Sequence, residues 1–187
     1  MRNIKSYLIT DPNYFSDNKE IFKEKLIAVL KNHKIDFACF RDKSSKNIEE
    51  LAKIFLQICK EFEIENILIN SNISLAIKLG FDGVHLNSQQ FDKIENAKKS
   101  KLITIISCHN LEELNKAINK NIDFVTYSPI FDTPNKGQSK GVDKLNEVIE
   151  KFPNLKIFAL GGIIQNEQIK EIEKTKAYGF ASIRYFI

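Results

Sequence analysis

Short apolar segments alternate with amphipathic segments along this chain, and the alternation constrains its fold more than any other feature. Apolar segments typical of buried β-strands occur at residues 4–10, 35–41, 67–69, 83–86, 102–107, 157–160 and 178–183, and another opens the stretch 123–137. Helical segments separate them, and such alternation indicates a parallel sheet. The sequence therefore predicts an α/β fold, a single-domain (β/α)8 TIM barrel over residues 1–187 whose last helix is short or missing.

An open, doubly wound parallel sheet is the alternative fold. Eight regular units, and the lack of Gly-x-Gly-x-x-Gly after the first strand, count against it. The helices are expected to begin at residues whose side chains can cap them. These residues are Asp17 in a capping box with Glu20, Ser44 or Ser45, the run Asn70-Ser71-Asn72, Ser88, and Asn110 in a second box with Glu113.

Composition disfavours several classes of protein. Hydrophobic residues make up 43% of the chain, and no apolar run approaches the length of a membrane span. The first residues, MRNIKSYLITD, hold no small-residue cleavage site, so we expect a cytoplasmic protein without membrane association. The net charge of +4 comes from Lys interleaved with Glu, which indicates a solvated outer face and disfavours nucleic acid as a partner. Cys39, Cys59 and Cys108 lack metal or disulfide spacing and are predicted to be packing residues.

Two consecutive strands end in groups that suit an anion. The loop after the sixth strand carries Thr133, Asn135 and Lys136, which offer a hydroxyl, an amide and an ammonium group. The seventh strand ends in Gly161 and Gly162, where backbone amides can approach a phosphate that a Cβ would block. We therefore predict a phosphate site at these two strand ends. Thr133 and Asn135 have the alternative role of shaping their own loop.

Charged and polar side chains follow other strands. Arg41 and Lys43 lie on one face of the second strand by its period of two, which puts positive charge at its carboxyl end. Arg184 ends the eighth strand, and a guanidinium group can bind phosphate. His85, on the fourth strand, has two alternative roles: contact with a ligand, or a hydrogen-bonded place inside the barrel mouth.

Six short motifs occur in order at strand ends. They are YLITD (7–11), FRDK (40–43), GVHL (83–86), SCH (107–109), SPIFDTPNKG (128–137) and ALGGI (159–163). Together they resemble the motifs of the thiamin phosphate synthase and TenI-like thiazole tautomerase family, over almost the whole chain. The resemblance implies a (β/α)8 barrel, a homodimer, and a small-molecule thiazole phosphate as substrate.

The resemblance also exposes a difference in metal binding. The synthase reaction that it implies joins a thiazole phosphate to hydroxymethylpyrimidine diphosphate, with Mg²⁺ on the departing diphosphate, and Mg²⁺ binds through carboxylates. Where the family has Asn-Asp-Asp after the third strand, this chain has Asn70-Ser71-Asn72, and Ser88-Gln89-Gln90 replaces a carboxylate after the fourth. Asp92 is a weak substitute ligand. No metal site and no cofactor is predicted, and Mg²⁺ is expected only if the chain is a synthase.

Two further departures concern the substrate. Cys39 stands where the family has a glutamine that contacts the diphosphate, and Arg184 stands where it has a serine that begins a phosphate-binding helix. An arginine does not replace a helix N-terminus whose amides converge on an anion.

The tautomerase reaction, as the resemblance implies it, needs a base and no metal. His109 occupies the position of the family's histidine, and imidazole suits proton transfer near pH 7. We therefore predict His109 as the catalytic base. The residues predicted to bind the substrate or its phosphate are Arg41, Lys43, Asn70, His85, Ser107, Thr133, Asn135, Lys136, Gly161, Gly162 and Arg184.

Three functional hypotheses follow, and nucleic-acid binding through the lysines, which would be steeply salt-sensitive, is a least favoured fourth. The favoured one is TenI-like: metal-independent proton transfer on a thiazole phosphate, or binding of it. The alternatives are a thiamin phosphate synthase with an altered Mg²⁺ site and a non-catalytic barrel that keeps an anion pocket. Thiamin phosphate made from both substrates with Mg²⁺ would favour the synthase. Unchanged isomerisation after His109→Ala, with ligand still bound, would favour the non-catalytic barrel.

Overall fold

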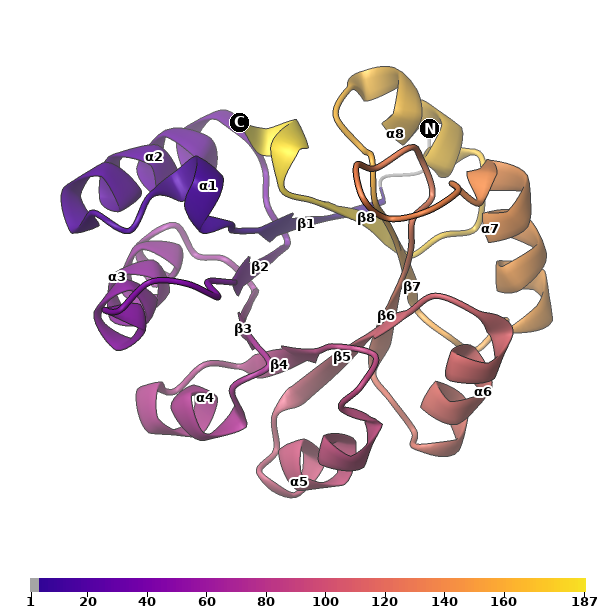
Figure 1. Ribbon diagram of the computed structural model, residues 1–187, viewed down its shortest axis with the longest axis horizontal. Helices are drawn as coiled ribbons and strands as arrows, with labels where there is room; N and C mark the ends of the chain where they lie inside the picture. Colours follow the sequence, from indigo (N-terminus) through magenta and orange to yellow (C-terminus); the bar gives the residue numbers. More distant parts are fainter. Residues whose placement is uncertain (1–3) are drawn as a thin grey trace.

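Eight parallel strands close into one barrel in sequence order in the computed structural model, which describes residues 4–187 (Figure 1). The strands are β1 (Lys5–Ile9), β2 (Phe37–Phe40), β3 (Asn66–Asn70), β4 (Gly83–Leu86), β5 (Ile103–Cys108), β6 (Phe124–Tyr127), β7 (Ile157–Leu160) and β8 (Gly179–Ser182). Each strand pairs with the next, and β8 pairs with β1 through Tyr7 and Ala181. The prediction of a closed barrel is confirmed, and the open sheet is excluded.

Helices surround the barrel on its outer side (Figure 1). The strand connections contain α2 (Lys19–Asn32), α3 (Ile48–Glu61), α4 (Ile73–Leu79), α5 (Ile94–Lys99), α6 (Leu111–Asn119), α7 (Gly141–Lys151) and α8 (Asn166–Glu173). Shorter elements are α1 (Pro12–Phe15) and the 3₁₀ turns η1 (Phe91–Lys93) and η2 (Arg184–Phe186). Only η2 follows β8, so the last helix is reduced to one turn, as predicted. Among residues 4–187, every helix is too short or too polar to cross a lipid bilayer.

Side chains alternate along the strands between two apolar layers. The inner layer fills the barrel, and the outer layer joins strands to helices. The inner layer consists of Tyr7, Ile9, Phe37, Cys39, Leu68, Ile105, Phe124, Phe158 and Ala181. All three cysteines are free and buried, which confirms them as packing residues. Burial raises the pKa of the Cys39 and Cys108 thiols to about 12.

Three aspartates link neighbouring strands where the strands begin. Each aspartate directly precedes an even-numbered strand, and its carboxylate accepts a backbone N–H from the strand before it. The bonds run from Ser6 to Asp36 at 2.9 Å, from Ile67 to Asp82 at 2.8 Å and from Thr104 to Asp123 at 2.8 Å. This repeated bridge pairs β1 with β2, β3 with β4, and β5 with β6 at the end of the barrel away from the strand carboxyl termini.

Several helix starts differ from the prediction. The caps expected at Asp17, at Ser44 or Ser45, and at Ser88 are wrong, and the residues found at these N-caps are Asn18, Asn47 and Gln90. The carboxylate of Asp42 accepts the amides of Ser44 and Ser45, which turns the chain before α3 can start. Ser88 does not cap a helix, because the chain first forms the turn η1, which begins at Phe91, and α5 follows that turn. Asn72 and Asn110 cap α4 and α6 as predicted.

Candidate active site

The imidazole of His109 is fixed at the end of β5 by the end of β6. Nδ1 lies 3.2 Å from the carbonyl oxygen and 3.1 Å from the hydroxyl oxygen of Ser128. Since a carbonyl oxygen can only accept, it favours the tautomer protonated at Nδ1, which leaves the lone pair on Nε2. Among residues 4–187, Nε2 has no hydrogen-bond partner, so it is the ring atom free to exchange a proton.

The backbone of His109 is held as firmly as its ring. Its N–H donates to the carboxylate of Glu113 at 2.5 Å, and the side chain of Asn110 accepts the Glu113 N–H at 2.9 Å. The expected pairing of Asn110 with Glu113 is present, but the glutamate reaches one residue further back than in a capping box. The start of α6 therefore positions His109.

The loop from β6 to α7 packs against the end of β7. Ile130 donates its N–H to Leu160 at 2.9 Å, and Phe131 donates to Gly161 at 3.0 Å. A Cβ on Gly161 would lie 2.8 Å from the Cα of Pro129. A Cβ on Gly162 would lie 2.5 Å from the carbonyl oxygen of Asp132. The loop itself, rather than a ligand, thus fills the space that the glycines leave.

Backbone N–H groups remain available in the same turn. Gly161 and Gly162 have φ angles of +99° and +70°, which glycine adopts readily. No acceptor among residues 4–187 binds their amides. A phosphate at this turn therefore stays a prediction, now with two unpaired donors to receive it.

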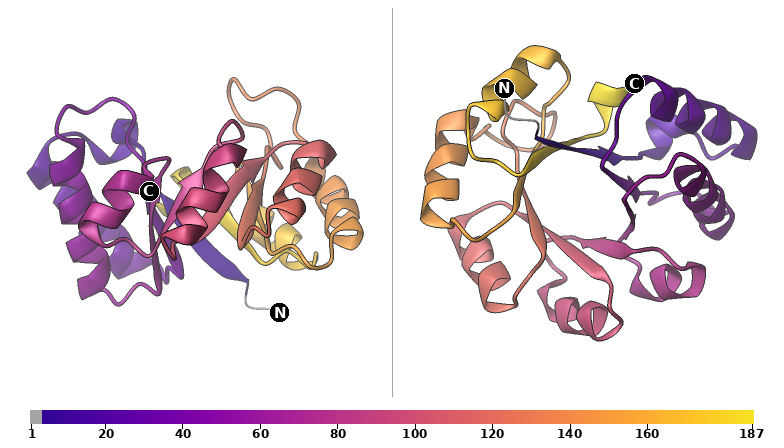
Figure 2. Two further views of the ribbon diagram at one scale, coloured as in Figure 1. Left: turned by 90° about the horizontal axis from the view of Figure 1, so that it is seen from below. Right: turned by 180° about the vertical axis from the view of Figure 1, so that it is seen from behind.

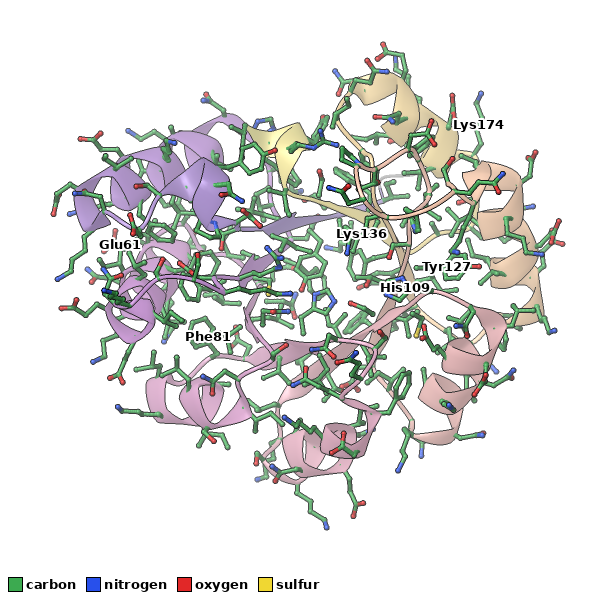
Figure 3. The ribbon with its side chains drawn as sticks, viewed as in Figure 1. Glu61, Phe81, His109, Tyr127, Lys136 and Lys174 are labelled. Atoms are coloured by element: carbon green, nitrogen blue, oxygen red, sulfur yellow. The ribbon has the colours of Figure 1, made fainter. Side chains whose placement is uncertain are left out.

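Thr133, Asn135 and Lys136 have distinct roles in the loop. Lys136 donates its N–H to the Thr133 carbonyl at 3.2 Å, and Asn135 has a φ of +61°, as at the third position of a type II turn. The hydroxyl of Thr133 donates to Phe131 at 2.9 Å. Thr133 and Asn135 thus have the loop-shaping role given as their alternative. The loop rises beyond the barrel end in the left view of Figure 2, and Figure 3 shows Lys136 and His109 on the same side of the barrel opening.

His85 lies inside the barrel and is hydrogen-bonded on both ring nitrogens. It is 3% exposed. Its Nδ1 is 2.9 Å from the Tyr7 hydroxyl, and its Nε2 is 3.1 Å from the Ser107 hydroxyl and 3.4 Å from that of Thr126. Burial, with a smaller effect of the Arg41 charge, lowers the pKa of His85 to about 4. Of its two predicted roles, His85 therefore has the second, a hydrogen-bonded position inside the barrel. Ser107 lies between His85 and the rim.

Arg41 and Arg184 lie at separate places on the barrel. The guanidinium of Arg41 forms an ion pair with Asp11, so part of its charge is already compensated. Arg184 begins η2. Ser182, which the sequence analysis overlooked, donates its hydroxyl to Ile163 at 2.8 Å and accepts the Tyr185 N–H at 3.1 Å. The sequence signal that could have identified Ser182 is a serine two residues before Arg184, where the last turn begins. Its hydroxyl links the end of β8 to the turn after β7.

Ser71 and Gln90, at the positions where the resemblance places metal carboxylates, bind each other. The Gln90 Nε2 donates to the Ser71 carbonyl at 3.4 Å, and its Oε1 accepts the Asn87 N–H at 3.1 Å. Within residues 4–187, no three His, Cys, Asp or Glu side chains gather in a way that could hold a metal ion. Mg²⁺ binds in proteins through one or two carboxylates plus substrate phosphates, and Ser71 and Gln90 supply no carboxylate at these two positions.

A cavity of about 560 Å³ opens beside these two positions, between the loops after β2 and β3 and the start of α5. Lys43 and Asn70 line it, together with Ser71 and Lys93. His109, Lys136 and the two glycines do not. Most predicted site residues therefore fall into three groups: the cavity, the barrel interior, and His109 with the β6–α7 loop and the glycine turn after β7. Arg41, paired with Asp11, and Arg184, in η2, lie outside these groups.

The fold defines a class of protein: a (β/α)8 barrel, with most of the candidate site residues at the carboxyl ends of its strands. The chain belongs to the thiamine monophosphate synthase family, whose model matches residues 6–186. The family resemblance stated from the motifs is thereby confirmed, and with it the prediction of an enzyme.

Individual relatives carry the name of the synthase. "Putative thiamine-phosphate synthase 2" of Aquifex aeolicus is 36% identical over 97% of this chain and 96% of its own length. "Thiamine-phosphate synthase 1" of Streptococcus pneumoniae is 31% identical over 77% of this chain and 72% of its own. A solved structure, thiamine phosphate pyrophosphorylase from Pyrococcus furiosus, superposes with a TM-score of 0.82 at 25% identity, covering 96% of this chain and 85% of that one. These names favour the synthase alternative over the tautomerase.

Proposed function

We propose that this protein acts on a thiazole phosphate at the rim of the barrel by metal-independent proton transfer, with His109 as the base. The observation that carries the proposal is the Nε2 of His109, which has no hydrogen-bond partner among residues 4–187. Elsewhere on the barrel, Ser71 and Gln90, which stand where the resemblance places metal carboxylates, are hydrogen-bonded to each other. A tautomerisation moves one proton between two atoms of the substrate. One positioned base is therefore sufficient, and no metal is required.

Each group has a role in this reaction. Nε2 of His109 takes the proton from one substrate atom, and the imidazolium returns it to another. Ser128 holds Nδ1 during both steps. The amides of Gly161 and Gly162 receive the phosphate, and Lys136 on the adjoining loop adds positive charge. His85 takes no part in proton transfer, since it is neutral at pH 7 and its ring nitrogens are both occupied.

The first prediction concerns His109. With a thiazole carboxylate phosphate as substrate and EDTA present, wild type is expected to isomerise it, and His109→Asn is expected to lose about 10²- to 10⁴-fold in kcat, the usual contribution of a general base. NMR of the substrate over time measures this. His33→Asn is the matched control, because His33 lies against Tyr185 and Phe186, outside the groups placed here in the site. Equal rates for wild type and His109→Asn would contradict the assignment.

A thiamin phosphate synthase is the second candidate, and the names of the relatives favour it. Incubation with both synthase substrates, with and without Mg²⁺, separates the two. Thiamin phosphate formed only with Mg²⁺ would replace the first proposal with the second. No reaction in either assay, with ligand bound, would leave a non-catalytic phosphate-binding barrel.

We also propose that the protein works in the cytoplasm as a homodimer, with a small phosphate ester as its ligand and no role for nucleic acid. The family resemblance supports the dimer. The interleaving of Lys with Glu supports the exclusion of nucleic acid, because a nucleic-acid surface gathers its positive charge.

A further inference from the structure

Two lysines that form no ion pair among residues 4–187 line the cavity beside Ser71. Lys43 comes from the loop after β2 and Lys93 from η1, and both line the cavity. Among residues 4–187, neither side chain forms an ion pair. Many other lysines of this chain are paired with glutamates on helix surfaces. These two are therefore available to an anion.

The remaining polar lining consists almost entirely of neutral donors. Asn72, Asn96 and Ser74 offer amide and hydroxyl groups, whereas the Asn70 amide already donates to the His85 carbonyl at 3.0 Å and the Ser71 hydroxyl to Asn70 at 3.4 Å. The one carboxylate, that of Asp42, accepts the amides of Ser44 and Ser45 at 3.0 and 2.9 Å and the Ser45 hydroxyl at 2.6 Å. Hydrogen bonds from Ser45 and Ser44, opposed by burial, hold the pKa of Asp42 below its usual value, so it stays ionised. Two positive charges and one internally bonded negative charge leave the cavity positive.

The loop that has Gln90 at the position of the family's carboxylate also carries Lys93. Gln90 binds the Ser71 carbonyl and forms the N-cap of η1, and its own carbonyl accepts the Lys93 N–H at 3.0 Å. The bond between the two loops keeps Lys93 beside the strand end that Ser71 follows. Positive charge from a side chain is thus brought to the place where the resemblance puts metal carboxylates and this chain has Ser71 and Gln90.

We propose that Lys93, together with Lys43, binds a phosphate ester or diphosphate group in this cavity without a metal. A lysine ammonium acts as a point charge that tolerates several phosphate orientations, and Asn72, Asn96 and Ser74 supply directional donors. Phe40, Ile48, Ile69 and Ile73 line the apolar part, which suits the organic portion of an ester. The proposal extends the metal-independent function proposed above and assigns a role to Lys93.

Inorganic diphosphate is the probe. Titrated calorimetrically into the full chain in EDTA, it is expected to bind wild type and to bind Lys93→Gln about five- to tenfold more weakly, since each tenfold corresponds to about 1.4 kcal/mol. Lys93→Arg is expected to restore most of the affinity. Lys176→Gln is the matched control, because Lys176 is an exposed lysine that precedes β8 and lines none of the cavity. The affinity of wild type is expected to fall as salt rises.

Two results would overturn the proposal: binding that requires Mg²⁺, or equal affinities for wild type and Lys93→Gln. An unchanged melting temperature of the unliganded variant excludes a folding defect as the cause of weaker binding. The outcome is separable from the proposed function. Isomerisation without Lys93-dependent binding would remove this inference alone, whereas metal-free, Lys93-dependent binding without isomerisation would remove the proposed reaction alone.

Discussion

At the scale of single residues, His85 and His109 differ in the hydrogen bonds that their surroundings give to each imidazole ring. His85 is enclosed by Tyr7, Ser107 and Thr126 inside the barrel. His109, by contrast, is hydrogen-bonded through Nδ1, and its Nε2 has no partner within residues 4–187. A base must present an unpaired nitrogen to its substrate. Only His109 meets that condition, which supports its proposed role.

The burial of His85 predicts a specific pH dependence of stability. Its pKa is about 4 in the folded state and near 6.5 when unfolded, so the unfolded chain binds the proton first as the pH falls. The free energy of unfolding should therefore decrease from pH 6.5 to pH 4, by on the order of 3 kcal/mol from this group. Urea denaturation at a series of pH values measures it. His85→Gln should lose that part of the slope, and an identical slope in both proteins would refute the prediction.

Gly161 is predicted to tolerate no side chain. Gly161→Ala would place a Cβ 2.8 Å from the Cα of Pro129 at a φ of +99°, so we expect a loss of about 2–3 kcal/mol in unfolding free energy. Gly137→Ala is the control, because Gly137 has a φ of +71° but no atom within 4 Å of the added Cβ, and it should cost only about 1 kcal/mol. Thermal denaturation compares the two. Equal losses would mean that backbone strain alone, without the loop contact, explains the glycine.

At the scale of elements, neighbouring strands are joined by hydrogen bonds to aspartate side chains, which the hydrophobic pattern does not predict. The aspartates before β2, β4 and β6 each accept an N–H from the preceding strand. In the sequence, Asp36 and Asp123 each stand between an isoleucine and a phenylalanine, but this local pattern does not show which N–H the carboxylate accepts. Their role depends on the register between strands, which is a tertiary property.

Asp123 offers a direct test of these bridges. Asp123→Ala removes the bonds from the Thr104 N–H at 2.8 Å and the Thr104 hydroxyl at 2.7 Å and leaves these donors unpaired, so we expect a loss of about 2–3 kcal/mol. Asp143→Ala, at an exposed position of α7, should change stability by less than about 0.5 kcal/mol. Chemical denaturation of both variants is the measurement. A small effect at Asp123 would mean that water replaces the carboxylate there.

At the scale of the whole molecule, the parallel sheet of the barrel brings the ends of β5, β6 and β7 together on one face. The proposed site depends on the pairing of these neighbouring strands, because His109, Ser128 and Gly161 lie far apart in the sequence. The homodimer is a prediction at the same scale. Light scattering coupled to size-exclusion chromatography is expected to give twice the chain mass of 21.6 kDa, and a single-chain mass would contradict it.

The sequence by itself determined the order and type of the elements, the closed barrel and the family. These follow from local periodicity and from short motifs at strand ends, and both can be read directly along the chain. The exchange of metal carboxylates for Ser71 and Gln90 was also visible in the sequence.

Only the tertiary structure decided which of the candidate residues lie together. His85 faces the barrel interior, Arg41 is paired with Asp11, and the space beside Gly161 is filled by the β6–α7 loop. Lys93 joined Lys43 at one cavity although they come from different loops. The physical reason is that a side chain's partners are set by distances between segments remote in the chain, whereas periodicity reports only on the neighbours of each residue along it.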